Sequence, residues 1–400
     1  MEYKMNIELL SRAECNVLRG LAIIGIFLHN YCHWIGPVVK ENEYQFFQRH
    51  ATAFAQAMSS PDLLWPMHIV SFFGHYGVPI FLFLSAYGLE RKYNNPVFGN
   101  ASPNSSSRGE TLSEEEKTPR THTLHTGQDV GIWAFICKHF VKLFRLMITG
   151  FVCFIVVDAV TPGSWHYNVT QIVAQLGMFN NLLPHPDQNI WPGPYWFFGL
   201  MMQLYIVYRL LLYRRHWGWT VGLMVICLGI QFFLGPESEA MNRYRYNFMG
   251  GMVPFGMGLL FARYGERIIL VRLGTAAMWM SLFVTSCLIV SMSYSFWWWN
   301  VIPLLICVAG VYFVKAVQTL TSNPMGTTLW KVLEWVGGIS GALFVIHPVL
   351  RKVFFPISRR GDYYTGLLLY VIASVGAAYL IHRITLQWKA EKADAKRTKE

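Results

Sequence analysis

Charged side chains are scarce in this chain of 400 residues. Asp, Glu, Lys and Arg together make up only 14% of it, whereas a soluble domain keeps about a quarter of its residues charged. This shortage excludes an ordinary water-soluble protein, because too little charge is available to cover its surface. The chain is instead 54% hydrophobic, with a mean hydropathy of +0.32. We therefore expect lipid to be the solvent for much of the surface.

Several local signatures are also missing. The seven cysteines form no C-x-x-C pair and have no zinc-binding spacing, so neither a zinc module nor a dithiol centre is expected. There is no G-x-S-x-G motif of the kind that carries a serine nucleophile. The formal net charge is +11, but the basic residues lie between apolar blocks and form no single patch. That distribution argues against a nucleic-acid partner and for a role of the charges in membrane topology.

Long apolar stretches are what the chain has in quantity. Ten of them approach the ~20 residues needed to cross a bilayer as a helix. We therefore predict an all-α polytopic membrane protein with about ten transmembrane helices, the sixth and ninth being the shortest. The predicted spans are Val17–Ile35, Ile69–Leu89, Leu143–Val160, Tyr195–Tyr213, Trp219–Leu234, Phe248–Phe261, Thr275–Met292, Trp297–Val314, Val336–Leu350 and Leu367–Ile384.

The distribution of basic residues orients these spans. No Lys or Arg occurs between Arg145 and Arg209, so Thr161–Pro194 is expected outside and both termini in the cytoplasm. One connection that this orientation places outside disagrees with the positive-inside rule, because it would hold four cations. Either its boundary is misplaced or it forms a basic rim facing an anionic acceptor, and both interpretations stay open. The four residues are Arg351, Lys352, Arg359 and Arg360.

The predicted organisation has four parts. Residues 1–93 hold the first two helices and an outer loop, in which Glu41–Pro61 is expected to be a short amphipathic helix. Residues 94–130 are a polar cytoplasmic insertion, expected to be disordered because it has almost no apolar side chains. Residues 131–388 hold the other eight helices, and 389–400 form a basic cytoplasmic tail.

Ionisable side chains inside the first span are the leading functional candidates, because such residues are costly in a membrane. His29 lies ten residues after Arg19, about 15 Å further along the helix. The alternative is a neutral, hydrogen-bonded structural imidazole. His33 follows at the i+4 spacing of two zinc ligands, but no H-E-x-x-H pattern accompanies it, and we expect no metal. His68 and His75 belong either to the same wet cavity or to a helix interface.

Four motifs occur in order along the chain. They are Arg19-Gly-Leu-Ala followed by His29, Phe81-Leu-Phe-Leu-Ser85, Tyr195-Trp-Phe, and Ile339-Ser ahead of Phe344-Val-Ile-His347-Pro. In this order they resemble the acyltransferase-3 family of integral membrane O-acyltransferases.

The resemblance implies a ten-span enzyme of a bacterial inner (plasma) membrane. Such an enzyme takes an acyl group, here expected to be acetyl, from cytosolic acyl-CoA and places it on a sugar hydroxyl at the outer face. His29 matches the family's essential histidine, Arg19 its partner arginine and His347 its late histidine. Two departures stand out. Ser85 is followed by Ala86 instead of glycine. Arg19 and His29 are one residue closer than usual, which leaves them about 80° apart on a regular helix unless a bulge restores the alignment.

The remaining expected site residues bind the two substrates. The CoA phosphates would contact Arg19 together with cations at the cytoplasmic border, of which Lys138, Lys142 and Arg145 share one helical face. The alternative is that these cations only flank the membrane. The expected cofactor-binding residues are Arg19, Arg91, Lys138, Lys142 and Arg145. The expected acceptor-binding residues are His33, His75, Tyr195, Trp196 and His347.

We expect His29 to act as the catalytic general base, taking the proton of the sugar hydroxyl as it attacks the thioester directly. The partners are then acyl-CoA, a sugar or glycan acceptor and the lipid bilayer. A transporter or flippase of a sugar or lipid-linked substrate is the alternative, since ten spans and intramembrane histidines fit it too. A non-catalytic scaffold would leave His29 unexplained. The identity of the acceptor and the oligomeric state stay open.

Overall fold

The computed structural model describes residues 9–94, 130–265 and 274–397, and in these ranges the chain folds into helices without any strand. Eight helical stretches are long and apolar enough to cross a membrane. The all-α, polytopic architecture is thus confirmed. The eight stretches are Arg12–Cys32, Trp65–Tyr93, Ile132–Val160, Gly193–Leu212, Thr275–Met292, Ile302–Ser322, Pro324–Arg359 and Tyr363–Trp388.

The other two predicted spans also lie on helices, α9 (Trp217–Phe233) and α11 (Phe248–Tyr264), each of 17 residues. The remaining bounds are α1 Arg12–Cys32, α2 Gln48–Ser59, α3 Trp65–Phe73, η1 Gly74–Tyr76, α4 Gly77–Tyr93, α5 Ile132–Val160, α6 Val169–Leu176, η3 Asn180–Leu182, α7 Pro186–Asn189, η4 Gly193–Tyr195, α8 Trp196–Val207, η5 Tyr208–Leu212, α10 Glu239–Tyr246, α12 Thr275–Met292, α13 Phe296–Trp299, α14 Ile302–Thr319, η8 Leu320–Ser322, α15 Pro324–Arg359 and α16 Tyr363–Arg397.

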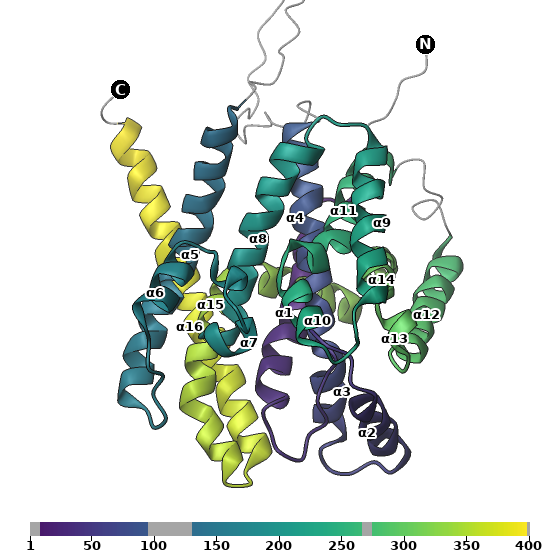
Figure 1. The fold of residues 1–400 in the computed structure, drawn as a ribbon, viewed down its shortest axis with the longest axis vertical. Coiled ribbons are helices and arrows are strands. Elements are labelled where there is room, and N and C mark those ends of the chain that lie inside the picture. The colour runs from purple at the N-terminus through teal and green to yellow at the C-terminus, as the bar shows by residue number, and fades with distance from the viewer. Residues whose placement is uncertain (1–8, 95–129, 266–273, 398–400) are drawn as a thin grey trace, which may run out of the picture.

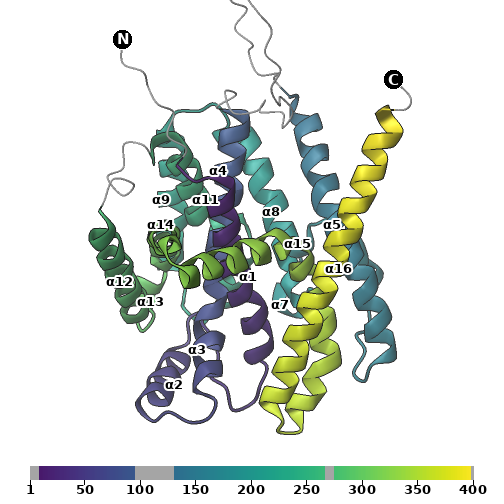
Figure 2. The ribbon, with the colours of Figure 1, turned by 180° about the vertical axis from the view of Figure 1, so that it is seen from behind.

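Most of the long helices run side by side (Figures 1 and 2). The C-terminal end of α16 and the N-terminal end of α1 point toward the same edge of the bundle. That edge corresponds to the predicted cytoplasmic side. Helices α2 and α3 and the turn between α15 and α16 lie at the opposite edge, the predicted outer side. Helix α15 first runs across the bundle and then turns down beside α16 (Figure 2). It contains Pro348 and Pro356, and a proline inside a helix bends it.

Helix α1 lies at the centre and is packed closely on both sides through glycines. A methyl group added at Gly20 would overlap the carbonyl of Leu333 in α15, and one at Gly337 of α15 would overlap the carbonyl of Asn16. On the other side, Gly77 of α4 lies against the carbonyl of Ala22. Only glycine permits backbones to approach so closely. The position of His29 on α1 is therefore fixed relative to both neighbours.

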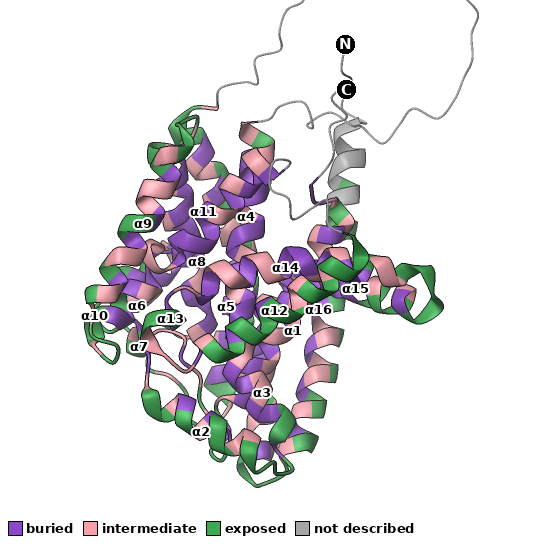
Figure 3. Ribbon diagram, turned by 90° about the vertical axis from the view of Figure 1, so that its right-hand side faces the viewer, coloured by how far each residue is buried: buried purple, intermediate pink, exposed green. Residues whose placement is uncertain are grey.

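The outward faces of the bundle carry apolar side chains. Phe233, Phe283 and Ile372 are exposed, and exposed residues cover the outer side of helices such as α12 and α9 (Figure 3). Such an apolar exterior suits contact with lipid. Some charged groups inside the bundle are paired, as Glu90 is with Arg263.

Two sequence-based boundaries need correction. The predicted outer helix Glu41–Pro61 is helical only from Gln48 to Ser59, because Glu41–Phe47 follows an irregular path into the interior. The last helix continues to Arg397, so the predicted tail begins as part of α16. The predicted disorder of the insertion falls on residues 95–129, outside the described ranges, and the four-part organisation remains a prediction.

Candidate active site

His29 lies in the last turn of α1 and is only 1% exposed. Its Nδ1 atom is 2.7 Å from the carbonyl oxygen of Ser71 in α3. Because a carbonyl only accepts hydrogen bonds, Nδ1 is the protonated nitrogen and the neutral ring carries its lone pair on Nε2. Gly74 makes this approach possible, since a methyl group there would lie 2.6 Å from Cβ of His29. The α1–α3 packing thus fixes both the ring and its tautomer.

The connection between α1 and α2, residues 33–47, folds back against this ring and is held by hydrogen bonds to distant elements. The hydroxyl of Ser71 donates to the carbonyl of Val39, and the Val39 amide donates to Nδ1 of His68. The indole of Trp299 in α13 donates to the carbonyl of Asn42. These bonds satisfy backbone groups that a buried loop would otherwise leave unpaired. The loop is therefore a fixed part of the site.

The loop brings two carboxyl groups to His29. Oε1 of Glu41 and Oε2 of Glu43 are each 3.9 Å from Nε2 of His29, and Glu41 is 3.5 Å from Nδ1 of His33. Burial, with the nearby Glu41 carboxylate, raises the pKa of Glu43 to about 8, against a hydrogen bond from Tyr44 and the charge of Arg245. Glu43 is therefore protonated at neutral pH, and the pair does not place two full negative charges side by side.

A cavity of about 470 Å³ opens in front of the His29 ring. Its wall includes an aromatic cluster in which Tyr44 stacks on Tyr246 at 3.9 Å between ring centroids and meets Trp196 edge-on at 5.3 Å. Polar groups of Lys40 and Asp187 also line it. This combination of volume, flat apolar faces and a few polar groups is that of a small-molecule site.

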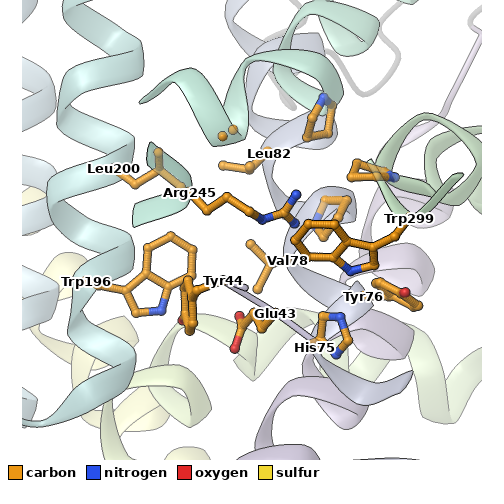
Figure 4. Close-up of a pocket in the computed structure, with 15 residues that line it drawn as sticks. Glu43, Tyr44, His75, Tyr76, Val78, Leu82, Trp196, Leu200, Arg245 and Trp299 are labelled. Carbon is orange, nitrogen blue, oxygen red and sulfur yellow. The ribbon is translucent and has the colours of Figure 1, made fainter. Parts of the chain in front are cut away.

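A second, much smaller space of about 40 Å³ lies deeper, between Glu43, His75 and α8, α11 and α14. Figure 4 shows Arg245 extending through it toward Trp299, with Glu43 and His75 on the other side. The Arg245 guanidinium lies 4.1 Å from the Trp299 ring centroid and donates to Gln231. Burial lowers the pKa of Arg245 to about 10, so the group stays cationic at neutral pH.

Comparison with known proteins identifies the family of the chain. A family model described as an acyltransferase domain matches residues 12–383. The chain belongs to the acyltransferase-3 family. It is thus an integral, multi-pass membrane acyltransferase that transfers groups other than amino-acyl groups. No curated protein and no solved structure matches the chain.

The structure brings together only part of the acceptor-binding set expected for this acyltransferase. His33, His75 and Trp196 line the cavity with His29. Tyr195 does not line it, because its ring is fully buried and its hydroxyl donates to the carbonyl of Val345 at 2.7 Å.

His347 is also fully buried and absent from the cavity wall. Its Nδ1 is 3.1 Å from the carbonyl of Leu343, while its Nε2 has no hydrogen-bond partner. The geometry of Tyr195 and His347 is that of residues that support the fold around the site.

The expected CoA-binding cations gather at the predicted cytoplasmic edge. Lys138 and Lys142 of α5 interact electrostatically with Lys92, next to Arg91 at the end of α4. Arg145 is exposed on the same helix. A cluster of like charges of this kind is suited to bind phosphate.

Arg19 is on α1 and not on α4 or α5, and its guanidinium donates to Asn16 at 3.0 Å. Helix α1 is a regular α-helix throughout. No bulge restores the alignment of Arg19 with His29, and the expected partnership of these two residues remains a prediction.

Sequence reasoning missed four site residues: Glu41, Glu43, Tyr44 and Arg245. A signal was available for the first two, since an acidic pair eight to ten residues after His33 is unusual in a chain so poor in charge.

A ligand set for a metal is also present. One atom each of His29, His33 and Glu41 lie within 4.8 Å of one another. These residue types could hold a zinc ion, although no metal is needed for the chemistry derived below.

Proposed function

We propose that this acyltransferase moves an acetyl group from cytosolic acetyl-CoA to a hydroxyl of a surface or lipid-linked sugar or glycan at the outer face of a bacterial plasma membrane. The observation that carries the proposal is the fixed tautomer of His29. Ser71 holds the proton on Nδ1, and the unprotonated Nε2 lies 3.2 Å from Nδ1 of His33 and 3.9 Å from a carboxyl oxygen of both Glu41 and Glu43. A neutral imidazole held in this way is a general base.

The reaction follows from this geometry. The acceptor hydroxyl replaces Nδ1 of His33 as the hydrogen-bond donor to Nε2 of His29. Its oxygen attacks the thioester carbonyl, while its proton passes to Nε2. The carbon–sulfur bond then breaks, and the CoA thiolate takes up the proton from the imidazolium. The products are the sugar ester and CoA, so that no protein-bound acyl group is required.

Glu41 and Glu43 assist this transfer. The imidazolium formed during the step is buried, where an isolated charge is costly. The Glu41 carboxylate, 3.9 Å from Nε2, offsets that cost, because opposite charges at this distance attract with several kcal/mol at the effective dielectric constant of ~20 found near protein surfaces. The protonated Glu43, at the same distance, contributes only its dipole. The attraction exists only after proton transfer, so it lowers the barrier and not the free energy of substrate binding.

The cavity supports a sugar acceptor. Its volume of about 470 Å³ is within the usual range of ~300–1,000 Å³ for ligand sites. The faces of Tyr44, Trp196 and Tyr246 can pack against the apolar C–H faces of a sugar ring, while hydroxyls reach the polar groups around them.

The test uses the purified enzyme in lipid vesicles with [¹⁴C]acetyl-CoA and outer-membrane or surface glycan from the source cell as acceptor. We expect His29→Ala to lower transfer by about 10²–10⁴-fold, the range for a lost general base. His185→Ala is the matched control, because His185 is exposed at the same side and does not line the cavity. Transfer by His29→Ala at the wild-type rate would show that His29 is structural. Passage of the glycan across vesicles without acetylation would favour the transporter alternative.

A further inference from the structure

Arg351 of α15 is a buried cation with few partners. Its side chain is only 7% exposed, and its one hydrogen bond in the described part of the chain runs from Nη1 to the carbonyl of Asn30, at 3.0 Å. None of the described carboxylates lies within 4.0 Å of it. A guanidinium has five N–H donors, and burying one without an opposite charge is costly. The site is therefore incomplete without an anion.

Two cavities meet at this guanidinium. Arg351, Trp34 and Trp191 line both the 470 Å³ cavity in front of His29 and an adjoining one of about 330 Å³. The Arg351 guanidinium lies 5.4 Å from the Trp34 ring centroid. Since Asn30 directly follows His29, Arg351 stands beside the catalytic ring, where a ligand that occupies both cavities must pass it.

The adjoining cavity is also positively charged. It is lined by Lys352 and Arg359 in addition to Arg351. Lys352 is neutralised by Asp158 at 2.8 Å. Arg359 is exposed and lies 5.4 Å from the Phe355 ring centroid. An excess of positive charge remains, at the side of the membrane where the positive-inside rule predicts few cations.

We propose that the acceptor is an anionic saccharide whose carboxylate or phosphate binds Arg351, while the hydroxyl to be acylated lies at His29. This inference rests on the proposed function and specifies its acceptor class. The planar guanidinium fork matches both anions bidentately. The tryptophans Trp34 and Trp191 beside it would flank the sugar that carries the charge.

The test measures binding, so that it does not depend on activity. Wild-type enzyme in nanodiscs of phosphatidylcholine is titrated with methyl glucuronide, glucose 6-phosphate and the neutral methyl glucoside. We expect at least one anionic probe to bind about tenfold or more tightly than the glucoside, as charge-assisted bidentate hydrogen bonds allow. Arg351→Gln should abolish that preference and Arg351→Lys should keep part of it. The matched control is Arg49→Gln, since Arg49 is an exposed cation bound to Glu237 and lines neither cavity.

The outcomes separate the two proposals. Equal binding of anionic and neutral probes by wild-type enzyme, or no binding of either anion, overturns the inference even if Arg351→Gln does not fold. Displacement of both anions by phosphatidylglycerol in the nanodisc assigns the site to a lipid headgroup and also overturns it. A clear anion preference together with a lack of acetyl transfer to any acceptor would leave the anion site standing and refute the proposed function.

Discussion

Glu43 provides a test of the site that requires no substrate. Burial and the neighbouring Glu41 raise its pKa to about 8 from an ordinary value of 4.5. The folded protein therefore keeps a proton on Glu43 that the unfolded chain releases above pH 4.5. The stability of the wild type should fall, relative to that of Glu43→Gln, as pH rises from about 4.5 to 8, and the difference should level off above pH 8.

The size of the effect follows from the shift. At about 1.4 kcal/mol per pH unit, this interval corresponds to an upper figure of about 5 kcal/mol in the free energy of unfolding. The Glu43 side chain is 15% exposed, and water relieves part of the cost, so we expect a few kcal/mol.

Thermal unfolding in detergent, followed by far-ultraviolet circular dichroism at a series of pH values from 5 to about 9, measures this difference. Glu237→Gln is the matched control, because Glu237 is half-exposed on the same side and forms a surface ion pair with Arg49. It should show little dependence on pH. A constant difference between Glu43→Gln and wild type across the whole range would refute the reasoning, since it would mean that Glu43 does not exchange its proton on folding.

Three further predictions concern the donor site, the orientation and metals. Replacing Lys142 and Arg145 by Gln should raise the KM for acyl-CoA with a smaller effect on kcat, because phosphate contacts act equally on ground and transition states; an unchanged KM would return both residues to a membrane-flanking role. A cysteine placed at Ser164, in the predicted outer loop, should react with an impermeant thiol reagent in intact cells, and protection there would invert the predicted topology. A chelator should leave transfer unchanged, whereas added Zn²⁺ should inhibit it by occupying Nε2 of His29; loss of activity on chelation would show that the metal ligand set is used.

The helices could be predicted from the sequence because long apolar runs identify them. The residues at which the helices begin and end could not be predicted from these runs, as α1 illustrates. It begins at Arg12, where Ser11 and Glu14 form a capping box, several residues before the apolar run. Glu14 is buried in the bundle and pairs with Lys315 of α14. Hydropathy alone cannot predict a buried Glu14, because its ion-pair partner is distant in the sequence.

Only those site residues that belong to local sequence motifs could be predicted from the sequence. His29 stood out as an ionisable residue within a span, and His33, His75 and Trp196 proved to line the same cavity. Glu43 lines this cavity from a folded-back loop, and Arg245 of the short helix α10 meets Glu43 only in the smaller space beside it. The two residues lie some 200 positions apart along the chain, so no sequence spacing connects them. Tyr195 belongs to a motif, but its hydroxyl donates to the backbone carbonyl of Val345. The direction of this side chain depends on tertiary packing, which the motif does not reveal.

The close glycine packing of α1 against α15 has a consequence for regioselectivity. His29 and Arg351 stand on these two helices, and the bond from Arg351 to the carbonyl of Asn30 links them again near the site. Because neither helix can slide past the other without displacing backbone atoms, the spacing between the two side chains is constant. We therefore expect the proposed anionic saccharide, bound at Arg351 by its charge, to present one particular ring position to His29. The distance of a hydroxyl from the anion would then decide which hydroxyl becomes an ester.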